Sequence, residues 1–549
     1  MHNFKMFISN TNTDTASDMI SYKDIDGFTF YLSEMMCGEK YHGYDKMLRS
    51  KGVAVRTTDT HVEIINDPFC SIPVYVYASK RLVMVTSRFE DVLQYPLTVD
   101  TVGYYEMLLY ESPLHDRTIF NEVKQLPAAG MLRINKTTLS KEISTYWDFD
   151  IVQDTEMNSE EMAVEAVWNQ FCGIFESYKG KKLLMGISGG LDSRLSMCAM
   201  KAIGCLDDAD LFTFGHYDGI LDYKLAKRAC QDAGYKGKVQ FYALDGESYL
   251  KSLELPIKSG GAVGIQHSHA YSSLKTMSLE GKVLVSNYYS DAIMGYDCME
   301  LDYPDTVENC AYYKKVQNNE WNMPSDIQKV IEDDIGKIAN RRRETSNFSC
   351  YDEFIYLVER NPKFHIRLSY IYSQMMDSVL PYANYDMLVR MISLPKEYRY
   401  GKRIEQLILK AKFTDMEDIS SSRYSRFEKK DKPLAEKLHY NLGFLRMRVI
   451  NLINCGMNIL SKGCIQIPNP YITENHLAVI NRYFYEQKKD ACRALYERGL
   501  LEAGIASKYA KYCRRTHEAH KGFALLNAWM VIKEMADHSE SKHVIGEKI

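Results

Sequence analysis

The sequence predicts three parts: a mainly β region over residues 1–150, an α/β domain with a doubly wound parallel sheet over 160–435, and a helical C-terminal extension over 436–549. In the first part, short runs rich in valine and tyrosine alternate with proline turns. In the second, strand-like apolar runs alternate with helical patterns, which is typical of a parallel sheet covered on both faces. Beyond about residue 305 the apolar periodicity is helical.

Composition limits the possible functions. The chain has 549 residues, 46% of them hydrophobic and 26% charged, which is ordinary for a globular protein of two or three domains. A net charge of −4 gives no general attraction to nucleic acid. The 13 cysteines form no C-x-x-C pair, the N-terminus lacks a signal-peptide pattern, and three asparagines interrupt the apolar stretch 449–460. We therefore expect a cytoplasmic protein without nucleic-acid or membrane partners; the oligomeric state stays open.

The elements of the first part are short. Strands are predicted over 74–77, 82–86 and 131–134, and a helix over 100–110. A turn is predicted at 126–130.

The α/β pattern begins near residue 183. Strands are predicted over 183–187, 210–215, 238–243 and 282–286, and helices over 191–204, 220–234, 265–279, 351–360, 364–379, 383–393 and 402–413. Ligands of such sheets bind beyond the carboxyl ends of the strands. Ser188, Phe214, Gly215 and the segment 286–291 would lie there.

The segment Ser188-Gly189-Gly190-Leu191-Asp192-Ser193 is the most informative stretch of the chain. It follows a buried strand and opens a helix, so its two glycines let the main chain approach an anion that faces the free N–H groups of the helix. The serine hydroxyls add donors, and Asp192 can hold Mg²⁺. The alternative interpretation is a glycine turn that only joins a strand to a helix.

This string resembles the pyrophosphate loop S-G-G-x-D-S of the ATP pyrophosphatase group, whose members cut ATP between its α- and β-phosphates. The resemblance implies an ATP site. The residues expected to form it are Leu184, Ser188, Gly189, Gly190, Leu191, Asp192, Ser193, Phe214, Gly215 and Ser286.

Four stretches in the same order resemble the asparagine synthetase family. They are residues 66–75, residues 118–148 with their T-I-F, L-P-A-A-G and Y-W-D strings, the loop 188–193, and residues 381–395. The resemblance implies an N-terminal glutaminase-like β-sandwich of the class II glutamine amidotransferase type. It also implies an adenine nucleotide α-hydrolase-like synthetase domain that uses ATP and Mg²⁺.

The N-terminus departs from that family. Its glutaminases use an N-terminal cysteine exposed by removal of Met1, but position 2 here is His2, and Cys37 cannot lie at the chain end. We therefore expect no glutamine hydrolysis. The chain is similar in this respect to β-lactam synthetase and the lasso-peptide cyclases, which join a carboxylate to an amine supplied by the substrate.

A second phosphate-side loop is expected at 286–292. By resemblance, Asp291 shares Mg²⁺ with Asp192, and Tyr288 stands where β-lactam synthetase has a tyrosine that helps to deprotonate its amine. Such a phenol needs a shifted environment or a base partner, for which Glu359 is a loose candidate. The alternative is that Tyr288 only packs.

Other positions carry weaker expectations. The family lysine in R-x-K-x-G-F has no counterpart at 423–427, where Arg423 or Arg426 could supply the charge. Asp222 is expected mainly as a helix cap or dipole partner. His267 and His269 are interpreted as substrate-loop or packing residues rather than metal ligands.

Together these features predict an ATP-dependent amide-forming ligase that acts on small-molecule or peptide carboxylates and amines, whose identities stay open. Two alternatives are a glutamine-dependent asparagine synthetase and a non-catalytic nucleotide-binding scaffold. His2 opposes the first. Ala292 and the missing lysine favour the second, whereas the intact loop opposes it.

Overall fold

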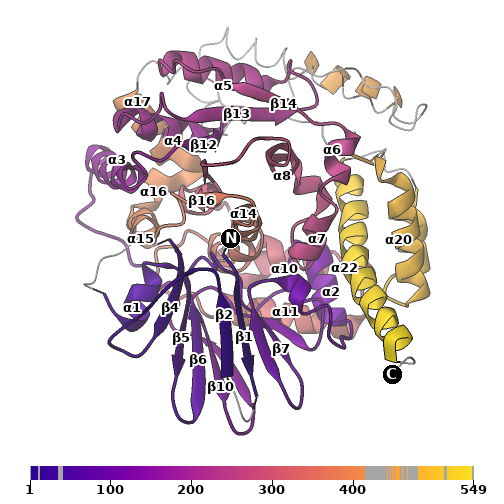
Figure 1. The fold of residues 1–549 in the computed structure, drawn as a ribbon. Helices are drawn as coiled ribbons and strands as arrows, with labels where there is room; N and C mark the ends of the chain where they lie inside the picture. Colours follow the sequence, from indigo (N-terminus) through magenta and orange to yellow (C-terminus); the bar gives the residue numbers. More distant parts are fainter. Residues whose placement is uncertain are drawn as a thin grey trace.

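The computed structural model describes residues 2–9, 13–34, 41–413, 480–511 except 482, and 516–546, with scattered residues between 442 and 467. Two antiparallel sheets form the N-terminal region (Figure 1). One has the order β2-β1-β8-β7-β9 and the other β11-β10-β6-β5-β4-β3. The strands are β1 Phe4–Ile8, β2 Thr13–Ser17, β3 Ile20–Lys23, β4 Thr29–Glu34, β5 Lys51–Thr57, β6 His61–Asn66, β7 Tyr75–Ala78, β8 Val83–Thr86, β9 Val123–Gln125, β10 Gly130–Asn135 and β11 Lys141–Thr145.

The two sheets pack face to face as a sandwich. Alternate side chains of each strand point inward, as the two-residue period of a strand requires. Phe4, Met6 and Ile8 of β1 lie in one buried cluster with Val62 and Ile64 of β6. The mainly β prediction for this region therefore agrees with the structure.

A five-stranded parallel sheet forms the second unit, with the order β14-β13-β12-β15-β16. Its strands are β12 Leu183–Gly186, β13 Asp210–Gly215, β14 Gln240–Ala243, β15 Val283–Val285 and β16 Asp377–Val379. All its pairings are parallel. The predicted parallel sheet is thus present, with the strand predicted first, β12, at its centre.

Helices cover both faces of this sheet. Leu183 and Met185 point into a core that holds residues of α3 Glu160–Glu176 and α4 Leu191–Ala202. Leu184, between them, points to the opposite core, with residues of α8 His269–Leu274 and α14 His365–Ser373. Burial on both faces explains why the central strands β12 and β15 are apolar runs.

Two predicted helices differ in the structure. The segment 265–279 breaks into the 3₁₀ turn η2 Ile265–His267 and α8, because Ser268 begins a new turn between them. The segment 364–379 contains α14 and then β16, whose three residues pair with β15. A strand this short has too few residues to show a period of its own.

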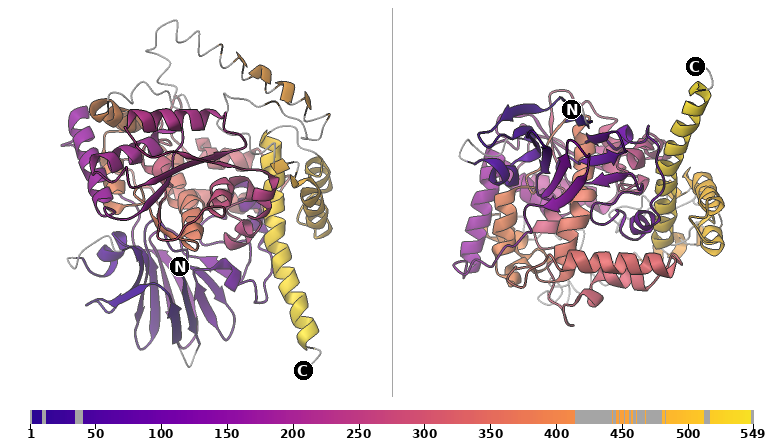
Figure 2. Two further views of the ribbon diagram at one scale, coloured as in Figure 1. Left: turned by 45° about the horizontal axis from the view of Figure 1, so that its top comes forward. Right: turned by 90° about the horizontal axis from the view of Figure 1, so that it is seen from below.

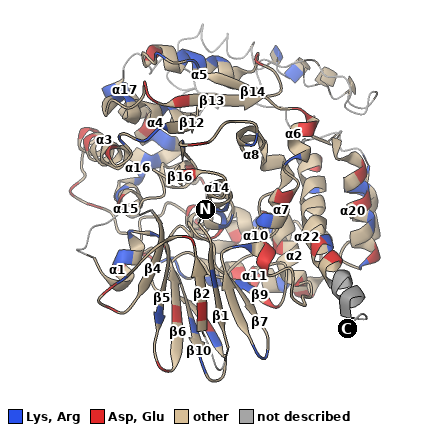
Figure 3. Cartoon of the chain, viewed as in Figure 1, with Lys and Arg blue, Asp and Glu red and all other residues tan. Residues whose placement is uncertain are grey.

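The remaining helices surround these sheets. In chain order they are α1 Gly43–Leu48, η1 Phe89–Asp91, α2 Thr101–Tyr110, α5 Leu221–Asp232, α6 Gly246–Leu250, α7 Glu254–Lys258, α9 Ser290–Ile293, η3 Val307–Asn309, α10 Ala311–Gln317, α11 Ser325–Ala339, α12 Tyr351–Ile355, the π turn η4 Tyr356–Arg360, α13 Asn361–Lys363, α15 Tyr385–Ser393, α16 Lys396–Arg399, η5 Tyr400–Lys402 and α17 Arg403–Lys412. Acidic and basic side chains are interspersed over both units (Figure 3).

The described C-terminal part is helical, with α20 Tyr485–Glu497, α21 Ala503–Tyr509 and α22 Thr516–Gly546. Helix α22 runs along one side of the molecule and contacts α20, α7, α2 and η2 (Figures 1 and 2). Within the described part of the chain, every helix is too short or too polar to cross a bilayer.

Candidate functional site

The strand order reverses between β12 and β15, and open α/β sheets bind ligands in a crevice at such a reversal. After β12 the chain adds β13 and β14 on one side, and it then crosses back to add β15 on the other. Loops that follow two strands at such a reversal diverge and leave room for a ligand. Here they are residues 187–190 and 286–289. A hydrogen bond of 2.8 Å from Ser196 Oγ to Asn287 Oδ1 links α4 to the second loop.

The first loop is shaped by its own serines. Ser188 Oγ accepts a hydrogen bond of 3.1 Å from the Gly190 N–H, and Ser193 Oγ accepts one of 3.1 Å from the Ser188 N–H. Gly190 is the residue before α4, so the free N–H groups of a twelve-residue helix face the loop. Positive potential at a helix start favours an anion there.

Asp222 contributes more to this loop than the sequence indicated. It lies in the first turn of α5, as a dipole partner would, but α5 has no side-chain cap. Its Oδ1 instead accepts a hydrogen bond of 3.1 Å from the Gly189 N–H. Asp222 therefore connects α5 to the glycine turn.

The two acidic residues expected at the site converge on one lysine. Lys402 Nζ lies 2.6 Å from Asp192 Oδ1 and 2.5 Å from Asp291 Oδ1. Asp192 comes from α4 and Asp291 from α9, which opens after the β15 loop. Both carboxylates contact the ammonium of Lys402, whose side chain is buried at 8% exposure.

The charges of this cluster shift one another's pKa values. Burial alone lowers the pKa of Lys402, but Asp192, Glu405 and Asp291 outweigh it and raise the pKa, so the lysine is charged. Burial, followed by the charge of Asp192, raises the pKa of the fully buried Glu405. The site therefore holds a fixed positive charge beside two carboxylates.

Lys402 corrects the expectation that the site lacks a lysine. Gly401 and Lys402 both have left-handed backbone, with φ of 58° and 64°, directly before α17. This kink turns the lysine inward. The signal in the sequence is the Tyr-Gly-Lys string before a helical pattern. Arg423 and Arg426, the replacements that we expected, lie outside the described residues.

Tyr288 lies among aromatic side chains. Its hydroxyl lies 3.2 Å from that of the buried Tyr372, and its ring stacks on His365 at 5.8 Å between centroids. Burial and then Arg360 lower the pKa of His365 to about 3, so this ring is neutral. Glu359 is not the partner of Tyr288: its Oε2 accepts hydrogen bonds from Lys363 and the His115 N–H, and its buried Oε1 has no hydrogen-bond partner in the part of the chain that the structure describes.

The other predicted nucleotide residues differ in their placement. Phe214 and Gly215 end β13, and Phe214 packs on His269 at 5.0 Å between ring centroids. Leu191 is the first residue of α4. Ser286 is buried and lies 2.7 Å from Ser369, oxygen to oxygen. Leu184 lies within β12, with its side chain in the core and its backbone paired with strands on both sides.

Asp297 is a further carboxyl close to this cluster. Its Oδ2 is buried, and among the described residues it has no hydrogen-bond partner. Burial, followed by the charges of Asp291 and Glu353, raises the pKa of Asp297 to about 8. The group is therefore mostly protonated at neutral pH.

This shift predicts a pH-dependent stability. Because the pKa is raised on folding, the proton on Asp297 contributes stability that is fully present below about pH 4 and is lost progressively as the pH rises from about 4 to about 8. Asp297→Asn cannot ionise and should be stabilised relative to wild type by about 2 kcal/mol more at pH 6 than at pH 4.5. Urea unfolding at both pH values measures this. The exposed Asp302→Asn is the control, and equal shifts in both variants would contradict the prediction.

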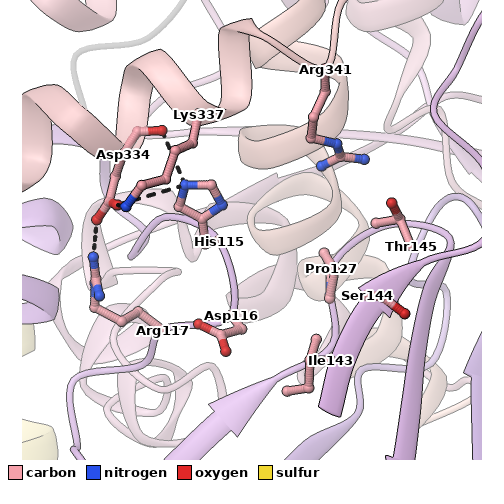
Figure 4. Close-up of a pocket in the computed structure, with 10 residues that line it drawn as sticks. All are labelled: His115, Asp116, Arg117, Pro127, Ile143, Ser144, Thr145, Asp334, Lys337 and Arg341. Atoms are coloured by element: carbon pink, nitrogen blue, oxygen red, sulfur yellow. Dashed lines mark hydrogen bonds and ion pairs between the residues drawn. The ribbon is translucent and has the colours of Figure 1, made fainter.

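A pocket of about 370 Å³ lies elsewhere, between the β-sandwich and α11 (Figure 4). In its lining, Asp334 accepts hydrogen bonds from both Arg117 and Lys337, whereas Nε and Nη2 of Arg341 are buried without a hydrogen-bond partner from any residue that the structure describes. None of the predicted nucleotide residues lines it. The crevice between β12 and β15 is therefore the better candidate site.

Comparison with known proteins assigns no family. No family model and no curated protein matches the chain. The NH3-dependent NAD synthetase of Campylobacter jejuni subsp. jejuni NCTC 11168 aligns over 33% of this chain and 96% of its own, at 15% identity and a TM-score of 0.18. NMN synthetase from Francisella tularensis aligns over 38% of this chain and 96% of its own, at 13% identity and a TM-score of 0.20. A structure described as the allosteric regulatory enzyme of purine biosynthesis aligns over 44% of this chain and 74% of its own, at 7% identity and a TM-score of 0.16.

Proposed function

We propose that this chain is an ATP-dependent carbon–nitrogen ligase. More specifically, it would act in the manner of asparagine synthetase-like enzymes, without hydrolysing glutamine. A substrate carboxylate attacks the α-phosphorus of ATP and displaces pyrophosphate, and an amine then attacks the acyl-adenylate and displaces AMP. The observation that carries the proposal is the convergence of Asp192, Asp291 and Lys402 beside the Ser-Gly-Gly loop.

The first step needs positive charge around the leaving pyrophosphate. The start of α4 and the Lys402 ammonium would supply it as preorganised groups. Asp192 and Asp291 offer carboxylate oxygens, partly exposed and from two elements, which fit a hard cation such as Mg²⁺. When bound, Mg²⁺ neutralises polyphosphate charge, and Lys402 would then pair with the phosphates.

The second step needs an amine without its extra proton. Tyr288 lies in the loop that leads into α9, three residues before Asp291, and its hydroxyl is within hydrogen-bond reach of Tyr372. Burial and the adjoining Tyr288 raise the pKa of Tyr372, which therefore stays protonated. We infer that Tyr372 donates to Tyr288 and directs the oxygen of Tyr288 toward the amine. Arg423 or Arg426 would add charge at the reacting oxygen.

The N-terminal region would keep a glutaminase-like fold without the reaction. Of the cysteines in residues 1–150, Cys70 is buried, and burial followed by Asp67 raises the pKa of its thiol. It is therefore a poor nucleophile. Cys37 lies outside the described residues, and His2 occupies the position where a terminal cysteine would be needed. The amine would come from a cytoplasmic small molecule or peptide.

The test is exchange of labelled pyrophosphate into ATP by the full-length protein with Mg²⁺ and a panel of carboxylates. We expect exchange that depends on one carboxylate class, and no ammonia from glutamine. ATP binding without exchange for any carboxylate would favour a non-catalytic scaffold. Ammonia from glutamine would favour a glutamine-dependent asparagine synthetase.

A further inference from the structure

A second cluster of ionisable side chains lies outside the proposed nucleotide site. It consists of Glu111, His267 and His520, whose potential ligand atoms all lie within 4.8 Å of one another. Glu111 directly follows α2, His267 ends η2, and His520 lies in the second turn of α22. Three segments far apart in sequence therefore bring two imidazoles and one carboxylate together.

The contacts within the cluster are close. His267 Nε2 lies 2.9 Å from Glu111 Oε1, and the rings of His267 and His520 lie 6.0 Å apart between centroids, at 34°. Arg360 Nη2 donates a hydrogen bond of 2.6 Å to the other oxygen, Glu111 Oε2. One carboxylate oxygen thus faces the histidines, while the second is held by a guanidinium.

The Glu111 carboxyl lies close to basic side chains. Burial alone raises the pKa of Glu111, but His267 and then Arg360 outweigh it and lower the pKa well below its usual range. The carboxyl is therefore ionised. Its backbone is left-handed, with φ of 61°, a conformation that costs a residue with a Cβ about 1 kcal/mol or more. This conformation ends α2 at the cluster.

Two histidine nitrogens and one carboxylate oxygen are a ligand combination that zinc takes, with a fourth position for water. Outer hydrogen bonds orient such ligands. Arg360 would neutralise the second oxygen of Glu111. Gln266 Nε2 lies 3.4 Å from Glu111 Oε1, and Asn527 of α22 donates to Gln266 Oε1 at 3.0 Å.

We propose that Glu111, His267 and His520 bind one divalent transition-metal ion of the zinc type, which fastens α22 to α2 and η2. The proposal does not depend on the ligase function. Helix α22 already packs against α2 and η2, so the ion would strengthen an existing contact. Metal that binds the folded chain but not the unfolded chain also stabilises the fold.

The test uses the full-length protein, stripped with chelator and titrated with Zn²⁺ itself. We expect one tight Zn²⁺ per chain by equilibrium dialysis and elemental analysis, and a higher melting temperature. His520→Ala should weaken binding about 100-fold or more, since even outer partners of ligands are worth about 10–100-fold. His538→Ala, an exposed histidine on the same helix, should change neither quantity.

Glu111→Gln keeps the size of the side chain and guards against a folding defect in the alanine variant. It should also lose the Zn²⁺ affinity and the thermal shift while the circular dichroism spectrum stays native. Tight binding that survives in both His520→Ala and Glu111→Gln would overturn the proposal. Failure of the wild-type chain to bind Zn²⁺ at micromolar concentration would also overturn it, leaving the cluster as an ion pair.

Discussion

Asp192→Asn is expected to lower carboxylate-dependent pyrophosphate exchange by on the order of 10³-fold, because it removes one of two carboxylates beside the phosphate loop. The amide has nearly the same shape but carries no charge for a hard cation. Lys402 keeps its contact with Asp291, at 2.5 Å, so the crevice should retain its structure. The measurement is the initial exchange rate at saturating ATP across a range of Mg²⁺ concentrations.

Asp207→Asn is the matched control for this substitution. Asp207 belongs to the same α/β unit but pairs with Lys236 at the surface, with a distance of 2.9 Å between Nζ and Oδ2. Exposed pairs of this kind contribute little, so the exchange rate should stay within about twofold of wild type. If Asp192→Asn also retained exchange, the proposed role of Asp192 would be wrong.

The sheet was predictable because its cause is local. The strands at 183–186 and 283–285 are apolar runs, and both cores of the α/β unit use them. β16 escaped prediction because its three residues form a strand only by pairing with β15. The segment 265–279 also makes a tertiary contact that the local pattern does not show: the Ile265 N–H donates a hydrogen bond to Asn527 of α22, 262 residues away.

The candidate site likewise contains one part that is visible in the local sequence and one part that depends on tertiary contacts. The loop 188–193 carries its own signal, since its glycines, serines and Asp192 are contiguous. Lys402 lies in the site because the kink at Gly401 brings its ammonium next to Asp192 and Asp291, which are distant in sequence. Glu359 was a wrong partner for Tyr288. Its carboxylate forms an ion pair with Lys363, four residues later on the same helical segment.

Arg399→Met is expected to lower the free energy of unfolding by about 3–5 kcal/mol, the largest effect on stability that we predict. Arg399 Nη1 lies 2.5 Å from Glu353 Oε1, and Nη2 donates a hydrogen bond of 2.6 Å to the Asn347 carbonyl. Both charged side chains are almost fully buried, at 0% and 1% exposure. Methionine would leave the Glu353 carboxylate buried without its counter-charge. Urea unfolding at pH 7 measures the change.

Two comparisons separate this cause from a simple loss of charge. Arg403→Met removes a neighbouring arginine whose ion pair with Glu160 is exposed, and it should cost less than about 1 kcal/mol. Arg399→Met combined with Glu353→Leu removes both buried charges and should recover a large part of the loss. A double variant as unstable as Arg399→Met alone would show that packing, rather than the unpaired carboxylate, sets the cost. Arg399 directly precedes the kink at Gly401 that places Lys402 in the site. If the buried pair holds this kink in place, Arg399→Met should also lower pyrophosphate exchange, and the double variant should restore it.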